Sequence, residues 1–325
     1  MIKYSFIIPV KEINNYIKET VEKISLIQRD DWEVIIYPDQ TTADSWPRVR
    51  QIASGPGGPA LKRNLAIADA LGDFLIFIDD DAYPREDFLE KLDEDFKDPG
   101  VVATGGPAMT PATDSFWQKV SGAVFLSSFS GGYPERYASV GTKKFFDDWP
   151  SVNLTVRKKD FAAVKGFNCG YWPGEDTKLC LDLLKESGGQ IIYDPALVAY
   201  HHRRGGLLKH LKQIGGYGIH RGFFAKKFPE TSWRWKYFIP SLFLLFVIGG
   251  GIAAQFSEPI RALYLVGWLI YLLGLIKAAK DIYQHEKNLL IILNALYYIF
   301  LTHLYYGWRF IQGLLFTREL KSKLR

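Results

Sequence analysis

The chain has only two cysteines among its 325 residues, Cys169 and Cys180, and no histidine before residue 201. Two cysteines are too few for a disulfide-stapled scaffold, and their separation matches no common zinc or redox motif. The first ten residues carry one charge and an apolar run too short for a signal peptide. We therefore expect free thiols in a reducing compartment and an N-terminal domain that stays in the cytoplasm.

Charge is divided unevenly along the chain, whose net charge is +5. From residue 231 to the end there are 11 Lys and Arg but only 4 Asp and Glu, whereas residues 1–230 contain 29 basic and 31 acidic residues. The positive excess therefore lies in the apolar last third of the chain. This pattern is typical of a soluble domain followed by a membrane anchor, and it argues against binding to nucleic acid.

The last third contains three apolar stretches, at about residues 237–256, 262–279 and 289–316. Each is about long enough to cross a bilayer. We therefore predict one domain over residues 1–230 and a transmembrane or interfacial helical anchor over residues 231–325. Two crossings would return Lys277–Asn288 to the cytoplasmic side, and a third would place the basic C-terminus outside. The sequence leaves open whether the third stretch crosses, lies in the interface or bends back.

Short apolar runs alternate with helical patterns over the first hundred residues. The runs are Tyr4–Val10, Trp32–Tyr37 and Phe74–Ile78, and the helical patterns cover Ile13–Gln28 and Ala60–Ala70. Fully apolar strands that alternate with helices indicate an α/β fold with a mostly parallel sheet covered on both faces. Ligands of such sheets bind beyond the carboxyl ends of the strands.

Polar residues follow each of these strands. The run PVKE follows the first and includes Pro9 and Glu12, Asp39 follows the second, and Asp79–Asp81 follow the third. Adjacent carboxylates repel one another unless a cation is present, and hard oxygen ligands can share Mg²⁺ or Mn²⁺. A solvated turn or a helix cap is the alternative for the three aspartates. Their place directly after an apolar strand favours a metal site.

The order of several motifs resembles that of the inverting glycosyltransferases of family 2, which have a nucleotide-sugar-binding α/β domain called GT-A. The resemblance covers about residues 4–230. It includes PVKE, Asp39 and FIDDD, together with KRN at 62–64, SVNLTVR at 151–157, KGFN at 165–168, PGEDT at 173–177 and AYHHRR at 199–204.

The resemblance implies a donor site. Asp39 would accept an N–H of the nucleobase, which suits uracil or guanine and so a UDP- or GDP-sugar. Asp79 and Asp81 would hold Mn²⁺ or Mg²⁺, and Arg63 would lie near the diphosphate. The remaining nucleotide-sugar-binding positions would be Pro9, Glu12, Lys62, Asp79 and Asp80.

The resemblance also assigns the acceptor side. Asp176 would be the general base, Glu175 would either support the metal or orient the acceptor, and Asn153 would lie on the acceptor side. Trp172, which lies near this base in the sequence, could stack on an acceptor sugar. An ordinary cap of the helix that begins near Glu175 is the alternative for the two acids, and both roles are compatible. Trp172 could equally be a core residue.

His201 and His202 follow a strand-like segment, Gln190–Tyr200. A neutral imidazole can complete a carboxylate-held metal site, and both histidines are therefore metal candidates. Because neighbouring residues of a strand point to opposite faces, only one of them should bind the ion. A solvated basic patch with Arg203 and Arg204 is the alternative. The basic, aromatic stretch Lys209–Lys227 predicts an interfacial helix.

We therefore expect a membrane-anchored, metal-dependent, inverting glycosyltransferase at the cytoplasmic face of the cell membrane. It would transfer a sugar to a hydroxyl of a lipid-linked or membrane-proximal glycan, in the assembly of a cell-surface polysaccharide. One alternative is transfer onto polyprenyl phosphate, because a phosphate is already ionised and needs no base. The other is a non-catalytic membrane protein that binds a nucleotide sugar.

Overall fold

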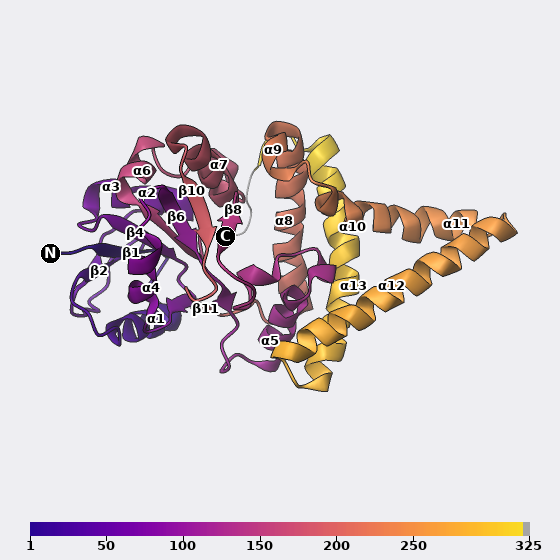
Figure 1. Cartoon of the computed structure of the whole chain (residues 1–325), viewed down its shortest axis with the longest axis horizontal. Coiled ribbons are helices and arrows are strands. Elements are labelled where there is room, and N and C mark those ends of the chain that lie inside the picture. Colours follow the sequence, from indigo (N-terminus) through magenta and orange to yellow (C-terminus); the bar gives the residue numbers. More distant parts are fainter. Residues whose placement is uncertain (321–325) are drawn as a thin grey trace. The chain divides into compact units, whose positions relative to one another are not determined.

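A computed structural model describes residues 1–320, which form two compact units (Figure 1). Unit 1 consists of residues 1–111 and 138–202, and unit 2 consists of residues 112–137 and everything from Arg203 onward. This division differs from the expected boundary at residue 230. The basic helix before residue 230 packs with the apolar helices, and so does an excursion of the chain at residues 112–137.

Unit 1 contains two sheets. The eight-stranded sheet has the order β3-β2-β1-β4-β9-β6-β10-β8, and four of its seven neighbouring pairs are parallel. The three-stranded sheet has the order β5-β11-β7. The strands are β1 (Tyr4–Pro9), β2 (Trp32–Tyr37), β3 (Val49–Gln51), β4 (Phe74–Ile78), β5 (Ala82–Pro84), β6 (Val101–Gly105), β7 (Ala108–Met109), β8 (Lys144–Phe146), β9 (Asn153–Arg157), β10 (Gln190–Tyr193) and β11 (Ala199–His201).

Helices cover both faces of the large sheet (Figure 1). They are α1 (Asn15–Ser25), α2 (Pro59–Asn64), α3 (Ala66–Asp69), α4 (Phe88–Asp95), α6 (Lys158–Ala163) and α7 (Glu175–Ser187). The predicted α/β class with parallel pairing of β1, β2 and β4 is confirmed. Because these three strands run in the same direction, their carboxyl ends and the polar residues after them lie at one edge of the sheet.

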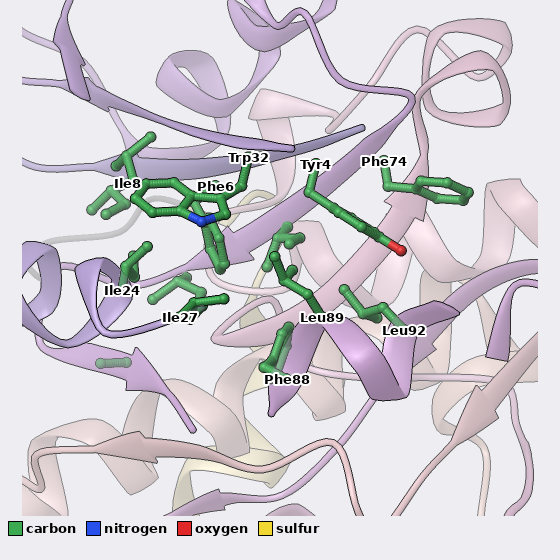
Figure 2. Close-up of a cluster of buried hydrophobic side chains, with 14 of the residues drawn as sticks. Tyr4, Phe6, Ile8, Ile24, Ile27, Trp32, Phe74, Phe88, Leu89 and Leu92 are labelled. Carbon is green, nitrogen blue, oxygen red and sulfur yellow. The ribbon is translucent and has the colours of Figure 1, made fainter. Parts of the chain in front are cut away.

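Strict alternation sorts the central strands into two cores. Tyr4, Phe6 and Ile8 of β1 join one buried cluster with residues of α1 and α4, whereas Ile7 joins a second cluster on the opposite face. Figure 2 shows Phe6 and Ile8 pointing with Trp32 toward Ile24 and Phe88. Successive side chains of a strand point to opposite faces, so in a sheet with helices on both faces every position of the central strands is buried.

The segment expected as one strand over Gln190–Tyr200 forms two strands in different sheets. β10 ends at Tyr193, and β11 begins at Ala199. A turn separates them, because the Asp194 carboxylate accepts a hydrogen bond from the Ala196 N–H (2.7 Å) and Pro195 has no N–H for a ladder. The turn lets β11 pair with β5, which directly follows the three aspartates.

Unit 2 is helical. Its elements are α5 (Phe116–Ala123), η1 (Val124–Leu126), η2 (Ser128–Ser130), η3 (Pro134–Arg136), α8 (Leu207–Lys227), α9 (Pro229–Ser232), α10 (Trp235–Leu245), η5 (Phe246–Gly250), α11 (Gly251–Ala253), α12 (Glu258–His285), α13 (Leu289–Ile311) and η6 (Gln312–Phe316). Three continuous helical segments, at Trp235–Ala253, Glu258–His285 and Leu289–Phe316, are long and apolar enough to cross a membrane. They coincide closely with the three stretches predicted from the sequence.

Replacing Leu75 of β4 with alanine should destabilise the protein by about 3 kcal/mol, because the side chain is fully buried and its removal leaves a cavity. Leu71→Ala is the matched control, since Leu71 is 66% exposed and its truncation should cost less than about 0.5 kcal/mol. Thermal unfolding of the full chain in detergent measures both. Equal effects of the two substitutions would contradict the assignment of β4 to the core.

Candidate functional site

Lys62 holds the carboxyl ends of β1 and β2 together. Its side chain on α2 is fully buried, and its ammonium donates to the carbonyl of Val10 (2.6 Å), the carbonyl of Tyr37 (3.3 Å) and the carboxylate of Asp39. These contacts use all three N–H groups of the lysine. Lys62 therefore fixes the position of Asp39, whose own side chain is 23% exposed.

Arg63, the next residue of α2, lies between two loops that carry acids. Its Nη2 donates to Asp79, and its Nη1 lies 3.6 Å from Oε1 of Glu175. The guanidinium also lies over the ring of Phe167. Within residues 1–320, its buried Nε and Nη1 have no hydrogen-bond partner. A buried guanidinium is stabilised by nearby carboxylates, so Arg63 links the aspartate loop after β4 to the start of α7.

Asn64 holds the loop that leads to α7. Its amide exchanges two hydrogen bonds with the backbone of Phe167, donating to the carbonyl at 2.8 Å and accepting from the N–H at 2.7 Å. Lys165 and Gly166, just before this contact, both have positive φ angles. The three consecutive side chains of the KRN motif thus contact the chain at the ends of β1, β2 and β4, the start of α7 and the loop that leads to α7.

Asp79, Asp81 and His201 come together at this edge. One ligand atom from each lies within 4.8 Å of the other two, and Nε2 of His201 is 3.1 Å from Oδ1 of Asp81. Antiparallel pairing of β5 with β11 places His201 opposite Ala82 and so beside the aspartate loop. Two carboxylates and an imidazole form a donor set that suits Mn²⁺ or Mg²⁺.

His202, the other metal candidate, and Asp80, predicted to bind the nucleotide sugar, lie outside this group. His202 points away from it, with Nε2 at 3.0 Å from the Glu19 carboxylate and its ring against Tyr16. The alternation of β11 thus separates the two histidines, and only His201 joins the aspartates. The Asp80 carboxylate accepts from the amide of Asn14 at 3.4 Å.

The two acids at the start of α7 have different surroundings. Glu175 is buried and accepts a hydrogen bond from the N–H of Gly174 (3.0 Å), whereas Asp176 is only partly buried and accepts from the N–H of Thr177 (2.7 Å). Thr177 in turn donates to the buried Asp148 at 3.1 Å. The N-terminus of α7 favours negative charge at both acids. A capping role for these carboxylates is therefore compatible with a catalytic role.

Burial is the main reason why the pKa of Glu175 lies well above its usual range, and the negative charge of Asp176 adds to this shift. The positive charge of Arg63 opposes it. Glu175 therefore holds a proton at pH values where an ordinary glutamate is ionised.

The other predicted residues occupy varied positions. Asn153 is fully buried opposite Ile78, and its amide donates to the carbonyls of Pro107 (3.1 Å) and Leu197 (2.9 Å). Trp172 is partly buried, and a Cβ on Gly58 would lie 3.9 Å from its ring.

Pro9 ends β1, and Glu12 is exposed in the loop that follows. Sequence reasoning named neither Asn64 nor Asp148 as a site residue, because each acts through a neighbour. The only available signal was the place of Asn64 in the KRN motif.

Glu175→Gln should raise the stability of the metal-free protein more at pH 8 than at pH 5. A raised folded-state pKa means that the native protein keeps a proton which the unfolded chain has lost. The stability contribution of Glu175 is therefore complete below the ordinary pKa of glutamate and falls as pH rises through the raised pKa. Glutamine cannot ionise, so unfolding temperatures with EDTA should show a gain that grows with pH. The exposed Glu186→Gln is the matched control, and a pH-independent gain for Glu175→Gln would contradict the prediction.

Comparisons with family profiles, curated proteins and solved structures relate the chain to glycosyltransferases. Residues 5–160 match the profile of glycosyl transferase family 2. A pre-mycofactocin glycosyltransferase of Mycobacterium tuberculosis is 34% identical over 147 residues, which are 45% of this chain but only 30% of that protein. The dolichyl N-acetyl-alpha-D-glucosaminyl phosphate 3-beta-D-2,3-diacetamido-2,3-dideoxy-beta-D-glucuronosyltransferase of Methanococcus voltae is 23% identical over 266 residues, covering 76% of this chain and 81% of that enzyme.

Among solved structures, a mannosyltransferase from Pyrobaculum calidifontis in complex with GDP-Man and Mn²⁺ is similar in fold. It has a TM-score of 0.56 at 18% identity and covers 87% of this chain and 88% of its own. The sequence motifs and the profile match over residues 5–160 agree in their likeness to glycosyl transferase family 2, and the fold is of the GT-A type.

Proposed function

We propose that this protein is a membrane-anchored glycosyltransferase that uses a UDP- or GDP-sugar and a divalent metal. The observation that carries the proposal is the convergence of Asp79, Asp81 and His201 beside the Arg63–Glu175 pair at the carboxyl edge of the sheet. A nucleotide sugar brings two negative charges on its diphosphate. A site with several carboxylates needs a cation to bind it.

The donor set fits Mn²⁺ or Mg²⁺, since two carboxylates and one imidazole offer hard oxygen and nitrogen ligands. When bound there, such an ion would neutralise the diphosphate and stabilise the departing nucleoside diphosphate. The Pyrobaculum structure, which contains GDP-Man and Mn²⁺, supports a metal in a neighbour of the same fold.

The donor is held by side chains whose positions are fixed by buried contacts. Asp39 accepts an N–H of the base, and the buried ammonium of Lys62 keeps its carboxylate in place. The buried N–H groups of Arg63 without a hydrogen-bond partner in the described chain suit an anionic ligand nearby. Lys62 is therefore a positioning residue, since its three donors already have partners.

Asp176 acts as the general base. It is the less buried of the two acids, and it lies at the helix N-terminus, which keeps a carboxylate ionised. It takes the proton of the acceptor hydroxyl as that oxygen attacks the anomeric carbon opposite the leaving group. Glu175, buried against Arg63, positions the loop and does not need to carry the transferred proton.

The acceptor is a hydroxyl of a lipid-linked or membrane-proximal glycan on the cytoplasmic side. Three apolar helices anchor the chain, and confinement of enzyme and acceptor to one surface raises their effective concentration. The name of the Methanococcus relative describes a sugar acceptor linked to a lipid phosphate. Polyprenyl phosphate as the direct acceptor and nucleotide-sugar binding without turnover are the rival functions.

Asp81→Asn should lower metal-dependent release of nucleoside diphosphate by at least about 100-fold, because the cation site loses one of its two carboxylates. The measurement is hydrolysis of a panel of nucleotide sugars by the full chain in detergent, with Mn²⁺ and then with EDTA. The matched control is Asp73→Asn. Asp73 is exposed just before β4, at the end of that strand opposite Asp79–Asp81, and the variant should keep normal activity.

Loss of activity with EDTA and in Asp81→Asn alone supports the donor site and identifies base and sugar together. Binding of a nucleotide sugar with no turnover, even with lipid-linked acceptors supplied, would favour the non-catalytic rival. Failure of the folded wild type to bind any nucleotide sugar would overturn the proposal.

Asp176→Asn should reduce transfer to a hydroxyl acceptor by about 10²- to 10⁴-fold while leaving donor binding intact, since only the proton acceptor is removed. Asp182→Asn, on the same helix and paired with Lys178, is the control. Transfer rates to a lipid-linked sugar and to polyprenyl phosphate distinguish the two acceptor classes. Loss of transfer to the lipid-linked sugar supports a hydroxyl acceptor. If polyprenyl phosphate is the preferred acceptor and transfer to it is unchanged in the variant, the result would support direct transfer to polyprenyl phosphate.

A further inference from the structure

α8 and α13 pack side by side in the same direction (Figure 1). His210 bonds to Thr302 (3.0 Å) near the start of the contact, and Lys226 donates to the carbonyl of Thr317 (2.7 Å) near its end. Glycines make the approach close: a Cβ on Gly218 would lie 2.9 Å from Cβ of Arg309. Whatever position α8 takes at a membrane, α13 therefore takes it too.

α8 is not an apolar span. It contains four exposed lysines and no acidic residue, and it is absent from the three segments that could cross a bilayer. The exposed lysines are Lys209, Lys212, Lys226 and Lys227. A basic helix of this kind fits the anionic headgroups at a bilayer surface.

The middle of α13 contacts the short segment Ser127–Ser130, which contains three serines. His303 is the fifteenth residue of the segment Leu289–Phe316, and its Nε2 donates to the carbonyl of Phe129 at 3.0 Å. The carbonyl can only accept, so Nδ1 accepts from the hydroxyl of Tyr271 (3.0 Å). Phe129 lies in η2, within the short segment Ser127–Ser130.

The same segment contacts the Lys277–Asp281 ion pair of α12. Ser127 donates to Asp281 at 2.6 Å, and Lys277 contacts both Asp281 (2.6 Å) and Ser128 (3.3 Å). If α13 crossed the membrane, its midpoint and this polar cluster would lie near the bilayer centre. Charged groups and irregular backbone are costly there.

α10–α11 and α12 differ from α13 in their packing. Only 17% and 11% of their apolar windows are buried, against 39% for the window of α13. Both contact α13 at one end, through Ser241 with the carbonyl of Gly307 (3.0 Å) and Tyr271 with His303, and then extend away from it to a tip near Ser257 (Figure 1). The tip carries the exposed Glu258–Arg261 ion pair, which requires water or headgroups.

We propose that the hairpin α10–α11/α12 is the only membrane crossing within residues 1–320, and that α13 lies beside α8 in the headgroup layer of the leaflet where the hairpin begins. The exposed apolar side of α13, with Leu293, Tyr297 and Trp308, faces the acyl chains. Aromatic residues of this kind favour the interface. Arg318 then lies on the same side as Lys277–Asn288, as the positive-inside tendency requires.

Accessible thiols test this arrangement in the full chain. The exposed native Cys169 marks the side of unit 1, and Ser257→Cys and Arg318→Cys are introduced separately. Sealed vesicles of one orientation are treated with a membrane-impermeant maleimide, and labelled peptides are identified by mass spectrometry. Labelling after detergent treatment shows that each thiol is reactive.

The expected result is that the Arg318→Cys thiol is labelled together with Cys169, while the Ser257→Cys thiol is labelled only from the opposite side. Labelling of the Arg318→Cys thiol from the side opposite Cys169 would show that α13 crosses, and this would overturn the proposal. Labelling of all three thiols from one side would overturn it as well, because the hairpin would then not cross. None of these outcomes depends on transferase activity.

Depth measurements provide a second readout. Nitroxide labels at Leu293→Cys and Trp308→Cys of α13 are 15 residues apart, so a spanning helix would separate them by about 22 Å in depth. An interfacial helix should give them nearly equal depths. Labels at Leu263→Cys and Leu273→Cys of α12 are the matched control and should differ by about 15 Å.

Discussion

The candidate site is held together by two buried cationic side chains, Lys62 and Arg63, because a buried positive charge must be compensated by nearby oxygen atoms. Lys62 and Arg63 are almost completely excluded from solvent, and each is stabilised by oxygen atoms from chain segments that are distant in sequence. A buried charge without such partners would cost several kcal/mol. The ends of β1, β2 and β4 and the start of α7 are therefore held together by one short helix, and the acids at these four places share one rigid surrounding.

The same network gives two neighbouring acids different chemistry. Glu175 lies inside, where burial raises its pKa against the opposing effects of Arg63 and of backbone hydrogen bonds. Asp176 lies one residue further along α7 and is partly exposed. Helical geometry directs consecutive side chains to different sides, so the carboxylate of Glu175 is buried while that of Asp176 stays partly exposed.

In unit 2, the cost of placing polar groups in hydrocarbon plays the corresponding part. Backbone and charged groups cannot be left unsatisfied in hydrocarbon, so the polar segment Ser127–Ser130 and the Lys277–Asp281 pair limit which helices can cross. By length and hydropathy, α10–α11, α12 and α13 could each cross a membrane. Packing distinguishes them, since α13 has partners along most of one side and the hairpin has few.

The sequence by itself determined the α/β class, the polar carboxyl edge, the three apolar helices and the order of the family motifs, because alternation, helical periodicity and short motifs are local properties. It could not show that Lys62 holds Asp39, that Asn64 holds Phe167, or that residues 190–200 form two strands in separate sheets. It also left open which histidine lies beside the aspartates. Only the tertiary structure decided these points, because each depends on contacts between residues far apart in the chain, where burial and charge pairing select among arrangements that are equivalent locally.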